Sequence, residues 1–173
     1  MIKAKKSLGQ NFLIDRNIID RITNSVTVQN RTLLEVGPGT GNLTSALLKK
    51  NPKKFFVVEK DDELISSLEK KFKDEITIIH DDILSFNENF LSKDKLVVFG
   101  NLPYNISTEI LCKWILNIDD KKIWFHNLVL MFQKEVANRI LANFNSSEYG
   151  RLSIIANWKL DIKKIIDIKP SCF

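Results

Sequence analysis

The 173-residue sequence has two cysteines, two histidines and no long apolar run, and each scarcity excludes a class of protein. Cys112 and Cys172 lie far apart without C-x-x-C spacing, and His80 and His126 stand alone. We therefore expect neither a disulfide framework nor a metal site, and a reducing cytoplasmic location. No apolar run approaches the roughly 18 residues of a spanning helix, and the N-terminal lysines have no apolar stretch behind them. The sequence predicts neither membrane insertion nor export.

What is abundant is basic charge, with 26 Lys and Arg against 21 Asp and Glu, a net charge of +5 and a pI near 9.1. Two clusters of lysines lie near the ends of the chain, Lys3, Lys5 and Lys6 at the start and Lys163, Lys164 and Lys169 near the end. A nucleic acid would be able to bridge the two clusters. Charge alone is weak evidence, because lysine-rich surfaces are also common on proteins that bind nothing acidic.

Four short runs rich in β-branched and aromatic residues alternate with segments of helical pattern. The runs are TLLEV at 32–36, FFVVE at 55–59, ITIIH at 76–80 and LVVF at 96–99, and the helices are expected at 42–50, 61–72 and 107–116. Continuously apolar strands are typical of a parallel sheet that is covered by helices on both faces. The sequence therefore predicts an α/β fold with a mostly parallel central sheet.

The two ends of the chain complete this arrangement. Beyond an apolar run at 128–133 and a helix at 134–144, the segments 152–160 and 163–168 are predicted to be strands. Short polar links before and between them suit antiparallel pairing, so we expect an antiparallel strand at the sheet edge. Residues 1–31 form an N-terminal arm, with a helix near 15–26, that has room to fold over the carboxyl edge of the sheet.

A glycine loop, EVGPGTGNLT, follows the first strand and opens the first helix, where a doubly wound sheet places its ligand loop. Gly37, Gly39 and Gly41 permit tight turns and close approach of a ligand to the backbone. Their G-x-G-x-G spacing differs from the G-x-G-x-x-G dinucleotide fingerprint, so a cofactor without a pyrophosphate is favoured over NAD. A plain tight turn is the competing interpretation of these glycines.

Acidic residues end the next two strands. Glu59 follows the glycine loop by about 20 residues, where a carboxylate accepts hydrogen bonds from ribose hydroxyls. Asp81 or Asp82 would accept from an adenine amine. Each acid alone is more often a solvated charge at a strand end, but a glycine loop and two acids at three successive strand ends indicate an adenosine-containing ligand.

The fourth strand ends in NLPY, at Asn101, Leu102, Pro103 and Tyr104. If the cofactor is S-adenosylmethionine, the Asn101 side-chain oxygen and the Leu102 carbonyl would bind the hydrogens of an adenine amine and direct its lone pair at the methyl group. Pro103 fixes the backbone, and Tyr104 offers a face on which an extruded base stacks. The alternative is a simple turn with Tyr104 capping the edge of the core.

The motifs KKSLGQNFL, EVGPGTGNLT, NLPYNIST, MFQKEVANRI, YGRLSI and KPSCF, taken in order, resemble those of the ribosomal RNA adenine dimethyltransferases that modify small-subunit RNA. The resemblance implies a Rossmann-like class I methyltransferase that uses S-adenosylmethionine. It also implies two methyl transfers to N6 of each of two adjacent adenosines near the 3′ end of 16S rRNA. The partner would be the immature small ribosomal subunit, and the protein would act as a monomer.

The resemblance also implies which residues form the site. The cofactor residues would be Asn11, Leu13, Gly37, Gly39, Glu59, Asp82 and Asn101, with Glu59 on the ribose and Asp82, which precedes the apolar Ile83, on the adenine amine. The catalytic residues would be Asn101, Leu102, Pro103, Tyr104 and Phe173, whose ring would stack on the target base opposite Tyr104. Residues 1–31 would be an arm over the active site, and 32–173 the catalytic domain.

The resemblance implies that relatives continue beyond that aromatic residue into a small helical domain, so we expect either that the natural protein is longer than this sequence or that the domain has been lost. Two alternatives stay open: a macrolide-resistance methyltransferase that acts on large-subunit rRNA, and a ribosome-assembly factor that binds RNA without catalysis. The intact NLPY motif and Glu59 argue against the second.

Overall fold

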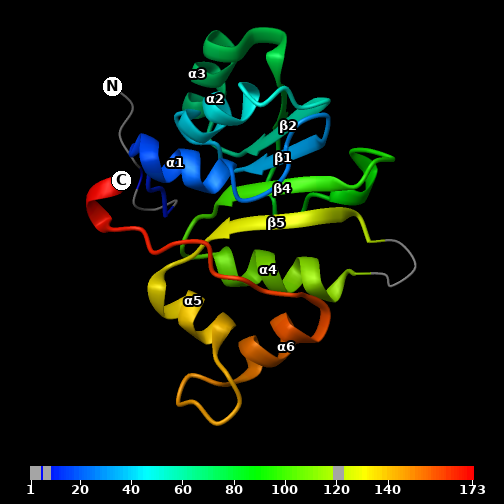
Figure 1. Ribbon diagram of the computed structural model, residues 1–173. Coiled ribbons are helices and arrows are strands. Elements are labelled where there is room, and N and C mark those ends of the chain that lie inside the picture. The colour runs from blue at the N-terminus through cyan, green and yellow to red at the C-terminus, as the bar shows by residue number, and fades with distance from the viewer. Residues whose placement is uncertain (1–4, 6–8, 119–122) are drawn as a thin grey trace.

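The computed structural model describes residues 5, 9–118 and 123–173 and has a single sheet between layers of helices (Figure 1). The strands are β1 (Thr32–Val36), β2 (Lys54–Glu59), β3 (Thr77–His80), β4 (Leu96–Asn101) and β5 (Phe125–Met131). Their order is β3-β2-β1-β4-β5, and every neighbouring pair is parallel. The predicted parallel sheet is confirmed, and the four predicted strands match β1 to β4 within two residues at each end.

The strand order changes direction between β1 and β4, and this position fixes where a ligand can enter. From β1 the chain moves outward to β2 and β3, and then returns to the other side of β1 as β4 and β5. In the register, Val36 lies beside Val58 on one side and beside Gly100 on the other, so the carboxyl ends of the three central strands are level. Open α/β sheets bind ligands in the crevice at such a switch point.

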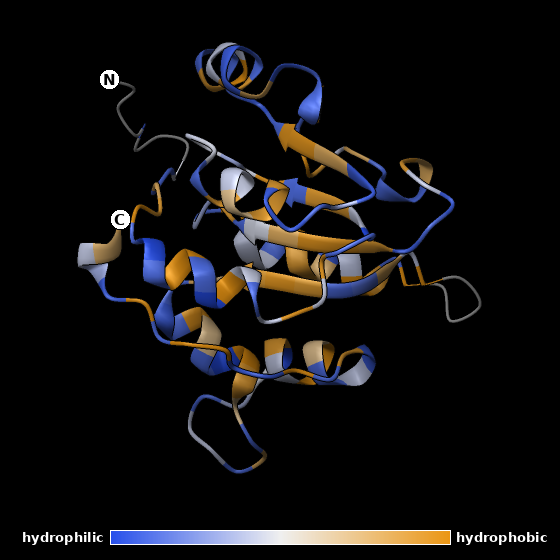
Figure 2. Cartoon of the chain, turned by 45° about the horizontal axis from the view of Figure 1, so that its top comes forward, coloured by the Kyte–Doolittle hydropathy of each residue, from blue (hydrophilic) through white to orange (hydrophobic). Residues whose placement is uncertain are grey.

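Helices cover both faces of the sheet. Helices α1 (Arg16–Thr23), α2 (Asn42–Leu48) and α3 (Asp62–Phe72) lie over one face, and α4 (Ser107–Leu116) lies over the other, with α5 (Lys134–Leu141) and α6 (Arg151–Lys159) outside it (Figure 1). Figure 2 shows the strands as the most continuously apolar part of the chain. Burial on both faces explains why their sequences do not alternate between apolar and polar residues.

The antiparallel edge predicted from the sequence is wrong. Residues Arg151–Lys159 form helix α6, residues 160–169 lie in no helix or strand, and the edge strand β5 pairs with β4 in parallel. The helix is favoured because it buries Ser153 and Ala156 against α4 and α5. The Ser153 hydroxyl donates to the Arg139 carbonyl at 2.6 Å and accepts from the Gly150 N–H at 3.2 Å, which fixes the first turn.

The two ends of the described chain lie near each other (Figure 1). The Ile14 and Asp15 N–H groups donate to the Cys172 carbonyl at 2.8 and 3.2 Å, so the segment before α1 is tied to the C-terminal segment. Part of the predicted arm, including Lys3 and Lys6 of the basic cluster, lies outside the described residues. Among the residues that are described, no helix is both long and apolar enough to cross a membrane.

Candidate functional site

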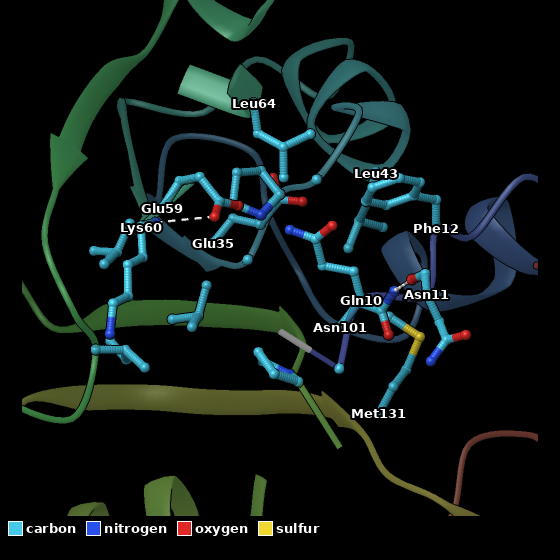
Figure 3. Close-up of a pocket in the computed structure, with 18 of the residues that line it drawn as sticks. Gln10, Asn11, Phe12, Glu35, Leu43, Glu59, Lys60, Leu64, Asn101 and Met131 are labelled. Atoms are coloured by element: carbon cyan, nitrogen blue, oxygen red, sulfur yellow. Dashed lines mark hydrogen bonds between the residues drawn. The ribbon is translucent and has the colours of Figure 1, made fainter. Parts of the chain in front are cut away.

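A cavity of about 360 Å³ opens at the carboxyl edge of the sheet, at the switch point (Figure 3). Its lining includes the arm at 9–13, the glycine loop at 37–40, the end of β2 with Lys60, the turn at 81–84, and Asn101 at the end of β4. Glu59 and Lys60 lie at one end of the view and Asn11, Asn101 and Met131 at the other. The parallel register therefore brings distant sequence motifs onto a single cavity.

The glycine loop approaches its neighbours too closely for side chains. Gly39 has a φ of +56°, and a Cβ there would lie 2.8 Å from Cδ1 of Phe12 on the arm. Gly41, which caps α2 with a φ of +74°, would place a Cβ 2.5 Å from the Phe72 ring. Positive φ and close contact both require glycine, so the loop presents bare backbone to the cavity.

Glu59 ends β2 with its carboxylate at the cavity wall. Its Oε1 accepts from the Lys60 and Asp61 N–H groups at 2.9 and 3.0 Å. Burial raises the pKa of Glu59, while these two N–H groups and that of Gly39 act to lower it. A carboxylate has about four acceptor positions, so Glu59 keeps the capacity to bind ligand hydroxyls.

Asp82 lines the same cavity as Glu59 and follows the end of β3 by two residues. Its Oδ2 accepts from Lys60 Nζ at 2.7 Å, and its Oδ1 accepts from the Leu84 N–H at 3.0 Å. The bond from Lys60, followed by that from Leu84, lowers the pKa of Asp82. The residue is therefore held as a carboxylate, the form that accepts a hydrogen bond from an amine. Asp81 lines the cavity too, and its Oδ1 accepts from the Asp82 N–H at 2.7 Å.

Asn101 joins the end of β4 to the arm. Its Nδ2 donates to the Asn11 carbonyl at 2.5 Å. A carbonyl oxygen only accepts, so this contact requires the amide nitrogen to face Asn11 and leaves Oδ1 as the acceptor of the side chain. A Cβ on Gly9 would lie 2.6 Å from Asn105 Oδ1, so the arm also packs closely against the residues that follow NLPY.

The structure separates the predicted catalytic residues into two groups. Asn101 and Pro103 line the cavity, whereas Leu102, Tyr104 and Phe173 are not among its lining residues. The Leu102 side chain is buried in the core beside α4. Tyr104 is half-buried, and burial raises the pKa of its phenol. Phe173 packs against the core on the α1 side.

All seven predicted cofactor residues line the cavity: Asn11, Leu13, Gly37, Gly39, Glu59, Asp82 and Asn101. Sequence reasoning missed Glu35, which also lines it from the position before the last residue of β1 and is 1% exposed. The Thr44 hydroxyl donates to Glu35 Oε2 at 2.7 Å, and burial raises the pKa of Glu35 to about 8. The signal was present, because an acid inside an otherwise apolar parallel strand needs a buried partner.

The arm is held over the cavity by Asp61, another residue that sequence reasoning missed. Asp61 caps α3 and accepts from Lys5 Nζ at 2.8 Å and from Gln10 Nε2 at 3.0 Å. Its pKa is lowered because the bonds from Lys5, Gln10 and the Glu63 N–H outweigh burial, which acts in the opposite direction. Asp61 thus connects the arm to α3 through its carboxylate. It is also connected to Glu59 through its backbone N–H.

Within the described part of the chain, no group of three or more His, Cys, Asp or Glu side chains is placed to hold a metal ion.

A family model described as ribosomal RNA adenine dimethylase matches residues 1–173. A protein of Pelagibacter ubique named ribosomal RNA small subunit methyltransferase A is 62% identical over 172 residues, which cover 99% of this chain and 65% of that protein. A protein of the same name from Nitrobacter winogradskyi is 40% identical, over 99% of this chain and 61% of that protein. The chain thus spans less than two thirds of the length of these curated relatives.

Two solved structures of methyltransferases resemble this chain in fold. A dimethyladenosine transferase from Plasmodium falciparum superposes with a TM-score of 0.82 at 31% identity, covering 94% of this chain and 58% of that one. The 23S rRNA methyltransferase ErmE superposes with a TM-score of 0.66 at 27% identity, covering 84% of this chain and 55% of that one.

Proposed function

Because the chain belongs to the ribosomal RNA adenine dimethylase family, we propose that it uses S-adenosylmethionine to dimethylate N6 of two adjacent adenosines near the 3′ end of small-subunit (16S) rRNA. The main observation that supports this reaction is that the glycine loop, Glu59 and Asn101 all line one cavity. The choice of RNA is supported by the 62% identity to a small-subunit methyltransferase.

The cavity residues suit the three parts of this cofactor. Gly39 has no side chain, so the Phe12 ring packs closely against its backbone, and the glycine loop would lie beside the methionine part of the cofactor. Glu59 would accept from the ribose hydroxyls, and Asp82 would accept from the adenine amine. When bound, S-adenosylmethionine supplies an electrophilic methyl group on a sulfonium.

The chain's own contribution to the transfer is positioning. Asn101 Oδ1, oriented by the bond from Nδ2 to Asn11, would accept a hydrogen of the adenine amine, and the Leu102 carbonyl would accept the other. Two acceptors directed at an amine favour a pyramidal nitrogen whose lone pair points at the methyl group. Tyr104 and Phe173, which do not line the cavity, would stack on the extruded base outside it.

Methyl transfer from labelled S-adenosylmethionine to undermethylated small and large ribosomal subunits, with the modified base mapped, tests this proposal. We expect two adjacent dimethylated adenosines in the small-subunit RNA. Label found in large-subunit RNA instead would assign the chain the reaction named for ErmE. If the protein binds the cofactor but methylates neither RNA, the remaining interpretation is an assembly factor that binds RNA without catalysis.

The matched variant for this experiment is Asn101→Ala. We expect it to fold, to bind the cofactor within a few-fold of wild type, and to transfer methyl groups roughly 100- to 1000-fold more slowly, the effect of deleting one preorganised polar group. Activity within a few-fold of wild type would remove Asn101 from the reaction.

The same proposal includes a cytoplasmic monomer that acts on the immature small subunit. Sedimentation of the purified chain with and without small subunits measures both its own size and its association with them. A stable dimer in the absence of RNA would contradict the first of these points.

A further inference from the structure

Lys113 of α4 joins its helix to the cavity wall that carries Asp82. Its ammonium donates to three acceptors: the Ile83 carbonyl at 2.7 Å, the Phe86 carbonyl, and Glu88 Oε1 at 2.9 Å. An ammonium has three N–H donors, so these three contacts use all of them. All three N–H groups of the lysine therefore bind to one segment of the chain, residues 83–88.

The contact is buried and has its own counter-ion. The side chains of Lys113 and Glu88 are 19% and 5% exposed. Glu88 Oε1 also accepts from the indole N–H of Trp114 at 2.6 Å, and Trp114 is itself 1% exposed. A buried ion pair that also hydrogen-bonds to its surroundings has one defined geometry, which a solvated surface pair lacks.

The segment that Lys113 holds has little regular structure of its own. Between β3 and β4 the chain has only the short 3₁₀ helix Glu88–Phe90. The Asp82 carbonyl accepts from the Ser85 and Phe86 N–H groups at 3.0 and 2.9 Å, which curls the backbone so that the Ile83 and Phe86 carbonyls face α4. Asp82, Ile83 and Leu84, on this same curl, line the cavity.

We propose that the Lys113–Glu88 pair is a positioning pair that fixes the wall formed by residues 82–84 and thereby sets the selectivity of the cavity for an adenine base. This inference rests on the proposed function, in which Asp82 accepts from the adenine amine. Lys113 acts through the Ile83 carbonyl within the wall and the Phe86 carbonyl just after it, and it does not itself line the cavity. The charge of Lys113 also contributes, after Lys60 and the Leu84 N–H, to the lowered pKa of Asp82.

The test compares two ligands that differ only at the base: S-adenosylhomocysteine and its deaminated analogue S-inosylhomocysteine, which has an oxygen in place of the amine. Calorimetry should show that wild type prefers the adenine ligand by roughly 10- to 100-fold, the scale of one hydrogen bond to a charged group. In Lys113→Met this ratio should fall to about three or less, mainly because the adenine ligand binds more weakly.

Lys113→Met leaves Glu88 buried without its cation and is at risk of failing to fold. The double variant Lys113→Met/Glu88→Gln removes both charges and keeps an acceptor for the buried Trp114 N–H, so no unpaired charge is left in the core. It should fold and still lose the preference, because the Ile83 and Phe86 carbonyls have lost their donor. Lys53→Met, which removes an exposed lysine paired with Asp94 at 2.6 Å, is the charge-matched control for the single variant Lys113→Met and should keep the wild-type ratio.

Two results would overturn the inference, and they are distinguishable. A folded double variant that keeps the wild-type ratio would show that the pair only stabilises the fold, and the proposed function would be unaffected. Equal affinity of wild type for the two ligands would remove Asp82 from the base, and would overturn both the inference and that part of the proposed function.

Discussion

Two glutamates on neighbouring strands illustrate what single residues reveal about this site. Glu59 ends its strand, so its position in the sequence predicted a place at the cavity, and it lines the cavity. Glu35 lies one residue before the end of β1 and was absorbed into an apolar run, although it lines the same cavity. Strand ends are visible in a sequence, but whether an acid within a strand faces a core or a cavity depends on which helix covers that face.

Glu35 should make the stability of the protein depend on pH. Its pKa is about 8 in the folded protein and near 4.5 when unfolded, so between these values the folded state binds more protons. The free energy of unfolding should therefore decrease from pH 4.5 to 8 because of this group, and show no further effect from it above pH 8. Glu35→Gln, which resembles the protonated form, should be more stable than wild type at pH 8 by an amount on the order of a few kcal/mol.

The measurement is urea denaturation of both proteins at pH 5 and pH 8. Comparing their difference at the two pH values isolates Glu35 from other titrating groups, since those are common to both proteins. A difference that is the same at pH 5 and at pH 8 would show that Glu35 is already ionised in the folded state throughout this range.

Among the elements, α6 shows where sequence patterns stop being informative. The strands β1 to β4 and the helices α2 to α4 were predictable because continuous apolar runs, turn residues and caps mark them locally. In α6, Ile154 and Ile155 favour a strand locally, while Ile154 and Trp158 are exposed in the structure and no clear apolar face identifies a helix. Its conformation is decided by Ser153 and Ala156 packing on α4 and α5, which only the tertiary structure provides.

The contact between the arm and α3 is also invisible in the sequence, and it leads to a prediction. Asp61→Asn keeps a side chain that caps α3 but removes the charge that binds Lys5. Because arm residues line the cavity, we expect cofactor affinity to fall by roughly two- to fivefold at low salt, the range of a single ion pair whose lysine is exposed. Calorimetry at 50 mM and 500 mM salt is the measurement, and the difference between the proteins should shrink at high salt.

The control for this prediction is Asp62→Asn, which makes the same charge change one residue away on a side chain that is 90% exposed. If both variants bind the cofactor equally well, the ion pair contributes nothing to holding the arm. The bond between Asn101 and Asn11 would then be sufficient to hold the arm.

At the scale of the whole molecule, the cavity and the excess of positive charge occupy different parts of the chain. The cavity is lined by residues between Gly9 and Met131. Residues 9–133 hold 16 Lys and Arg against 17 Asp and Glu, whereas residues 134–173 hold seven against four. The excess of positive charge therefore lies outside residues 9–133. It lies in α5, α6 and the C-terminal segment, together with the lysines near the N-terminus.

This separation leads to a prediction about length. The cofactor should bind to this chain within a few-fold of its affinity for a version that carries the remaining C-terminal portion of a longer relative, because the residues lining the cavity are already present. Methylation of small subunits should differ, since affinity for RNA sums many phosphate contacts and an added portion supplies more of them. We expect the longer protein to methylate faster at moderate salt and to show a steeper decline with salt, with a logarithmic slope growing by roughly 0.7–0.9 for each added phosphate contact. Equal rates and equal salt slopes would mean that these 173 residues carry RNA recognition unaided, with the basic C-terminal segment as the first place to look for it.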